Sequence, residues 1–109
     1  MQDLIQQLAT YIHVPAANTA AVVTLAADTS RRNGIASIHY SYSAAPTGGR
    51  LTITDGGTTV FNIDIIAGGE NSLYFDPPLA GLHNSAVVVT LAAGGGVVVG
   101  KLNIRPGKL

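Results

Sequence analysis

The 109-residue chain contains no cysteine and no tryptophan, and only 11% of its residues are charged. A typical globular domain has about 25% charged residues. Without cysteine the chain forms neither disulfide bonds nor thiolate metal sites. Six acidic residues balance six Lys and Arg residues, and the basic ones form no patch of the kind that binds nucleic acid. No apolar run is long enough to span a membrane as a helix. We therefore expect neither nucleic acid nor membrane as a partner.

Catalytic and metal-binding motifs are also missing. None of His13, His39 and His83 has a second ligand at the spacing typical of a zinc site. The acidic residues are scattered singly, without the regular series of a calcium loop. Glycines 94–96 lead into three valines, whereas a phosphate-binding loop leads into a helix through a Lys-Ser/Thr pair. The sequence predicts no enzyme activity, no cofactor and no metal.

The most informative segment that is present runs from residue 85 to residue 104. It reads as two strands, 86–92 and 97–104, joined by a glycine turn, and both strands are apolar on both faces. We expect one face to pack on a second sheet and the other on another protein. Because a weakly charged surface resists self-association poorly, we also expect the native state to be an oligomer or part of a larger assembly.

The rest of the chain alternates short strand patterns with turn residues. The hairpin signal is clearest around Asp55-Gly56-Gly57, where Leu51 and Ile53 are expected to share a face with Phe61. Pro77 and Pro78 are expected to stop the strand before them. Seven or eight strands are predicted, including 19–26, 35–43, 50–54, 58–66, 72–76, 86–92 and 97–104. This pattern predicts an all-β antiparallel sandwich, with a jelly roll as first choice and an immunoglobulin-like sandwich as second.

Residues 2–13 are the one helical candidate, ended by Pro15. Apolar residues recur there at helical spacing, at Leu4, Ile5, Leu8 and Ile12. The helix would pack on its own sandwich or dock on a neighbouring subunit as an arm. We therefore divide the chain into an N-terminal helix or arm, 1–14, and a single β-sandwich domain, 15–109. The first residues lack the pattern of a secretory signal, so we expect assembly in a cytoplasm.

Three segments of the sequence resemble those of a known class of protein. They are residues 40–53 (YSYSAAPTGGRLTI), 75–79 (FDPPL) and 87–95 (VVVTLAAGG). The sequence resembles small virion proteins from tailed-bacteriophage structural gene clusters, and it is similar in character to the jelly-roll cement or decoration proteins of phage capsids. The resemblance extends over about residues 18–104. It rests on composition and turn signatures, so it transfers no functional residue.

The resemblance implies a structural virion protein that is assembled in the bacterial host cytoplasm. Such a protein would bind the major capsid protein at contacts between capsomers and lie on the capsid surface as a homo-oligomer, either a dimer or a trimer. Nine residues are predicted to form the interface: Leu4, Ile5, Leu8, Ile12, Asp76, Pro77, Pro78, Leu79 and Arg105. One alternative is a tail, baseplate or fibre module that contacts host-surface glycans through a groove around Tyr74 or His83. The other is a lectin-like carbohydrate-binding domain.

Overall fold

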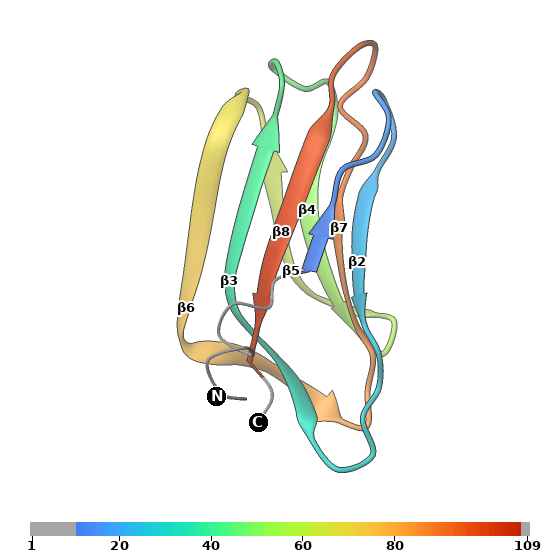
Figure 1. The fold of residues 1–109 in the computed structure, drawn as a ribbon, viewed down its shortest axis with the longest axis vertical. Helices are drawn as coiled ribbons and strands as arrows, with labels where there is room; N and C mark the ends of the chain where they lie inside the picture. Colours follow the sequence, from blue (N-terminus) through green and yellow to red (C-terminus); the bar gives the residue numbers. More distant parts are fainter. Residues whose placement is uncertain (1–10, 108–109) are drawn as a thin grey trace.

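The computed structural model describes residues 11–107, which form two antiparallel four-stranded sheets and, within that range, no helix (Figure 1). The strands are β1 (Tyr11–His13), β2 (Ala21–Leu25), β3 (Arg32–Tyr42), β4 (Gly49–Asp55), β5 (Thr58–Ile65), β6 (Gly69–His83), β7 (Val87–Leu91) and β8 (Gly100–Pro106). Sheet A has the order β1-β8-β3-β6, and sheet B has the order β2-β7-β4-β5. The prediction of an all-β antiparallel sandwich is confirmed.

The strands pair as nested partners. Sheet A contains the pairs β1·β8 and β3·β6, and sheet B contains β2·β7 and β4·β5. The chain therefore behaves like one long hairpin that is folded across two sheets, which is a jelly-roll-like arrangement. Within the described range no helix is long and apolar enough to cross a bilayer.

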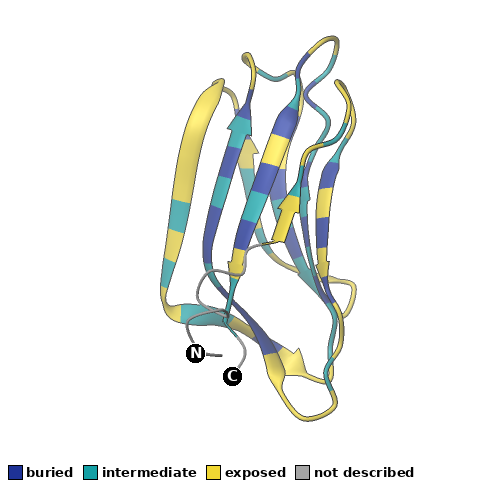
Figure 2. Ribbon diagram, viewed as in Figure 1, coloured by how far each residue is buried: buried dark blue, intermediate teal, exposed yellow. Residues whose placement is uncertain are grey.

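The core lies between the two sheets and comes from alternate residues of each strand. Figure 2 shows this alternation along β3 and β8. The most completely buried apolar side chains include Ile35, Ile38, Leu51, Ile53, Val89, Leu91, Leu102 and Ile104. Side chains of a strand point to opposite faces in turn, so one face of each sheet fills the core and the other meets solvent.

The predicted β4–β5 hairpin is confirmed. Its two central residues, Gly56 and Gly57, have φ values of 58° and 89°, the left-handed region that a tight hairpin turn demands. Ile53 pairs with Phe61 as expected, and Leu51 pairs with Ile63. The turn sets the first two pairs, Asp55 with Thr58 and Thr54 with Thr59, and a register shift between Thr54 and Ile53 then brings Ile53 opposite Phe61.

The predicted hairpin of the two apolar strands is wrong. β7 pairs with β2 and β4 in sheet B, whereas β8 pairs with β1 and β3 in sheet A. Residues 92–99 cross from one sheet to the other, and Val97 is 86% exposed instead of lying in a strand. Glycines 94–96 allow this wide crossing because Gly95 and Gly96 adopt positive φ. A local reading assigns such glycines to a tight turn between neighbouring strands.

The predicted N-terminal helix is wrong at its last residues. Tyr11–His13 form β1, which pairs with residues 102–104 of β8. Aromatic and β-branched residues suit an extended strand, and the free edge of β8 offers backbone partners that override the helical periodicity. Leu4, Ile5 and Leu8 lie outside the described residues.

β6 does not stop at Pro77. It continues to His83, but its pairing with β3 breaks between Tyr74, opposite Ser37, and Leu79, opposite Ile35. The residues between them bulge out of the ladder. β6 is an edge strand, so a proline there need not donate a hydrogen bond to a neighbouring strand.

Candidate interaction surfaces

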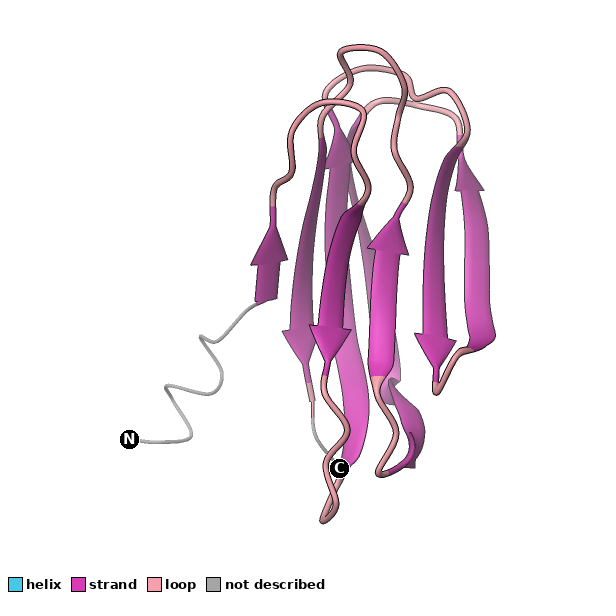
Figure 3. Ribbon diagram, turned by 90° about the vertical axis from the view of Figure 1, so that its right-hand side faces the viewer, coloured by secondary structure: helices cyan, strands magenta, loops and turns pink. Residues whose placement is uncertain are grey.

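Four connections gather at one end of the sandwich, at the top of Figure 1 and again in the side view of Figure 3. They are residues 14–20, 43–48, 66–68 and 92–99, and we call them the loop end. None of their residues is Asp, Glu, Lys, Arg or His. Alanine, glycine and valine dominate instead. An uncharged surface of this kind is easily desolvated, since it holds no ion that must lose its water.

Three of the four loops of this end are joined by hydrogen bonds, most of them between main-chain groups. The bonds run from Asn18 N to Val98 O (2.9 Å), from Ser43 N to Val99 O (2.9 Å), from Thr47 N to Gly94 O (2.8 Å) and from Val99 N to Ser43 Oγ (2.8 Å). Below them, the buried Tyr42 hydroxyl donates to Ala92 O at 2.7 Å. The segment 92–99 is the common partner in all of these bonds. The loop end is therefore a connected platform.

Two large apolar side chains project from the platform. Ile66 is 85% exposed and Val97 is 86% exposed, and Val14, the first residue of the 14–20 loop, is half-exposed. While these side chains stay exposed, the protein does not gain the favourable transfer free energy that burying them against a partner would give. They lie on two different connections of the same end, Ile66 between β5 and β6 and Val97 between β7 and β8.

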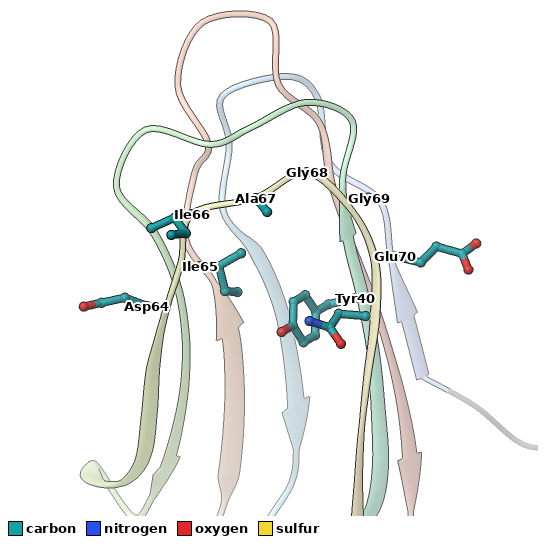
Figure 4. A pocket seen from close by; sticks show the side chains of 9 residues that line it. Tyr40, Asp64, Ile65, Ile66, Ala67, Gly68, Gly69 and Glu70 are labelled. Atoms are coloured by element: carbon teal, nitrogen blue, oxygen red, sulfur yellow. The ribbon is translucent and has the colours of Figure 1, made fainter.

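A hollow of about 230 Å³ lies beside the β5–β6 connection (Figure 4). The Tyr40 ring points into it, and Asp64 and Glu70 at its rim point away from that ring. Burial raises the pKa of the Tyr40 hydroxyl, and a hydrogen bond with Asn71 partly opposes this. Asp64 is engaged outside the hollow by Arg50 at 2.8 Å. With no convergent charged groups and a volume below the usual ligand range of about 300 Å³ upward, the hollow is a poor site for catalysis or metal binding.

The outer face of sheet A carries a polar cluster. Ser72, His39 and Asn103 lie side by side on β6, β3 and β8. His39 Nδ1 and Ser72 Oγ are hydrogen-bonded at 2.9 Å. Tyr74, 74% exposed, meets the His39 ring edge-on with 5.6 Å between ring centroids. Sequence reasoning placed His39 on a polar strand face, but it missed the contact with Tyr74, because the pairing of β3 with β6 is not a local signal.

The sandwich end opposite the loop end is fixed by polar side chains. Asn33, 1% exposed, donates through Nδ2 to the carbonyl oxygens of Leu25, Ala26 and Ser85 at 3.1, 2.8 and 3.0 Å. These bonds hold the 26–31 and 84–86 connections to the start of β3. Asp55 accepts from the Ser85 hydroxyl at 2.6 Å and from the backbone N–H of Leu82 at 2.9 Å. These groups act structurally, since each bond is internal.

The predicted interface residues are brought together only in part. Leu79 and Pro106, the neighbour of Arg105, both pair with Ile35, so the 76–79 segment and Arg105 flank β3 at the same end of sheet A. Ile12 is 64% exposed on β1, on the other side of β8. Their role as an interface remains a prediction.

The remaining histidines show no site chemistry. His13 Nδ1 accepts the Val22 N–H at 2.7 Å and so links β1 to β2. His83 is exposed at the end of β6. Among residues 11–107 no three His, Asp or Glu side chains gather as a metal site would require. The loop end was missed by sequence reasoning, although its signal, four turn segments without one charge, is legible in the sequence.

Family models and curated protein sequences give no match to this chain. Among solved structures, a chain of the acidic stable capsid of Helicobacter pylori bacteriophage KHP30 is similar over 94% of this chain and 90% of its own length, with 14% identity and a TM-score of 0.53. The Bacillus thuringiensis delta-endotoxin Cry8Ea1 matches 86% of this chain at 18% identity and a TM-score of 0.49, and this chain spans 19% of its length. The CBM36-1 domain of a xylanase from the hindgut metagenome of Trinervitermes trinervoides matches 88% of this chain and 96% of its own, at 7% identity and a TM-score of 0.48. The likeness concerns the β-sandwich fold alone.

Proposed function

We propose that this protein is a structural virion protein that binds the major capsid protein of a phage shell through its loop end. The observation that carries the proposal is the uncharged loop end, in which three loops are joined by hydrogen bonds and the fourth lies against Ala44 through Gly68, with Ile66 and Val97 exposed. The role is one of adhesion and needs no catalysis.

The rigidity of the platform favours tight docking. Association costs free energy for every loop and side chain that must be ordered. Here backbone hydrogen bonds already join three of the loops, and alanine and glycine have little side-chain entropy to lose. A modest apolar contact repeated over many copies then adds up across a shell.

The comparison with the phage capsid chain supports the proposal, since that likeness spans nearly the whole of both chains. A fold shared end to end agrees with a module that works as a complete unit. We also propose that the protein acts as a homo-oligomer on the capsid surface, as its low charge favours.

The test is co-sedimentation with shells assembled from the major capsid protein. The double variant Ile66→Asp/Val97→Asp places two carboxylates in the interface, and we expect its affinity for shells to fall at least about tenfold. Val60→Asp is the matched control, because Val60 is a 50% exposed valine on β5 outside the loop end. Equal binding of the double variant and the control would remove the loop end from the interface, and a wild-type protein that ignores shells would refute the function.

A further inference from the structure

The polar cluster on the outer face of sheet A has no part in the proposed docking. It lies on strands β6, β3 and β8, along the side of the sandwich and away from the loops. It combines the most exposed tyrosine of the described residues with hydrogen-bonding side chains that the sheet holds in place. Docking through the loop end therefore does not account for this exposed group of polar and aromatic side chains.

The geometry of the cluster is set by the strand register. Ser72, His39 and Asn103 form a row across three adjacent strands, which places Ser72 and Asn103 about 10 Å apart. Tyr74 stands in the next row, about 7 Å further along β6. Both rows project from the same outer face, because residues two apart in a strand point the same way.

His39 lies at the centre of the cluster and contacts three of its neighbours. Its Nδ1 is hydrogen-bonded to Ser72 Oγ at 2.9 Å, and its Nε2 lies 3.4 Å from Ser37 Oγ. Its ring meets the Tyr74 ring at an interplanar angle of 85°. Ser37 is only 3% exposed although it faces outward, which shows that its neighbours cover it. The imidazole is thus fixed on both sides, while the Tyr74 ring is left 74% exposed.

We propose that this cluster is a binding site for a neutral saccharide, with Tyr74 as the stacking platform. A pyranose ring presents an apolar C–H face, which an exposed aromatic ring covers, and a rim of hydroxyl groups, which both donate and accept hydrogen bonds. Ser72, His39 and Asn103 offer donors and acceptors beside the ring and carry no fixed charge. Of the charged residues of this face, Glu70 and Lys101 lie in the row on one side of His39, and Arg105 lies in the row of Tyr74, across Ser37 from it. The row of Ser72, His39 and Asn103 itself holds no Asp, Glu, Lys or Arg. The centre of the site therefore suits an uncharged, hydroxyl-rich ligand.

The test uses nuclear magnetic resonance of the whole protein titrated with xylotriose, cellotriose and N-acetylchitotriose. At about 10 mM, well above a weak Kd of about 1 mM, at least one of them should shift the backbone amide signals of residues 37–41 and 72–74. Tyr74→Ala should weaken that binding at least about tenfold. Tyr74→Phe should keep most of it, because the ring is retained. Tyr11→Ala is the matched control, since Tyr11 is a 48% exposed tyrosine on β1.

Two results would overturn the proposal: no shift with any of the three sugars, or shifts that survive both Tyr74→Ala and His39→Ala. A folded amide spectrum of each variant shows whether the sandwich is intact. The loop-end variant Ile66→Asp/Val97→Asp should bind the sugar as the wild type does. This separates a failure of the saccharide site from a failure of capsid docking.

Discussion

The two ends of the sandwich are held together by different kinds of hydrogen bond. At the loop end, most of the bonds join main-chain groups of two loops, and the side chains that take part, Ser43 and Tyr42, do so through neutral hydroxyl groups. At the opposite end, buried or half-buried polar side chains such as Asn33 and Asp55 reach across to the backbone. The difference shows how a protein can keep a surface both ordered and uncharged: the backbone supplies the polar partners, so the side chains are free to be apolar.

The first prediction concerns the end of the sandwich opposite the loop end. Asn33→Ala removes the donor to three carbonyl oxygens in a site that is 1% exposed. We expect the free energy of unfolding, measured in urea, to fall by about 3 kcal/mol, because buried carbonyl groups lose their partner. Asn62→Ala is the control, since Asn62 is exposed on β5 and should cost less than about 0.5 kcal/mol. A loss below about 1 kcal/mol at Asn33 would mean that the two ends do not differ in this way.

The second prediction concerns the hydroxyl that supports the loop end. Tyr42→Phe removes the donor to Ala92 O and should lower the free energy of unfolding by about 1 kcal/mol. Burial raises the pKa of Tyr42, an effect that the backbone N–H of Arg50 opposes and the charge of Tyr40 reinforces. The folded protein therefore holds this proton more tightly than the unfolded chain does. The contribution of Tyr42 to the free energy of unfolding should be constant up to a pH of about 10 and decrease above it.

The pH dependence gives this prediction its control. In Tyr42→Phe the fall above a pH of about 10 should be shallower than in the wild type, because one of the two tyrosines with a raised pKa is gone. Urea unfolding at a series of alkaline pH values measures both effects. An identical slope in the two proteins would show that Tyr42 does not release its proton differently on unfolding.

The smallest effect on stability is expected at the tips of the loop end. Ile66→Asp/Val97→Asp changes side chains that are 85% and 86% exposed, so the free energy of unfolding should change by less than about 0.5 kcal/mol. Differential scanning calorimetry checks this alongside the shell-binding assay. A large loss in the free energy of unfolding would mean that these two side chains stabilise the fold itself. The loop end would then not be a surface whose side chains are free of a structural role.

The sequence predicted the features of the fold that depend on residues close together in the chain, namely turns and the alternation of side chains along a strand. The β4–β5 hairpin followed from Gly56-Gly57, and the alternation of Phe61 and Ile63 gave the buried face. Pairings that depend on distant residues could not be predicted in this way. β1 replaced a helical pattern because the edge of β8 was available. The glycines 94–96 turn the chain back into the opposite sheet instead of beside β7 in the same sheet. The contact of Tyr74 with His39 likewise exists only because β6 lies beside β3.

The nested pairing has a consequence for how the chain assembles. The innermost pair, β4·β5, closes over two residues, whereas the outermost pair joins Tyr11 to Ile104. Loop-closure entropy rises with the length of chain enclosed, so each inner pair shortens the effective loop that the next pair must close. A fold with so many contacts between distant residues forms slowly. The nesting lets each pair of strands form after the pair inside it, starting from the Gly56-Gly57 turn.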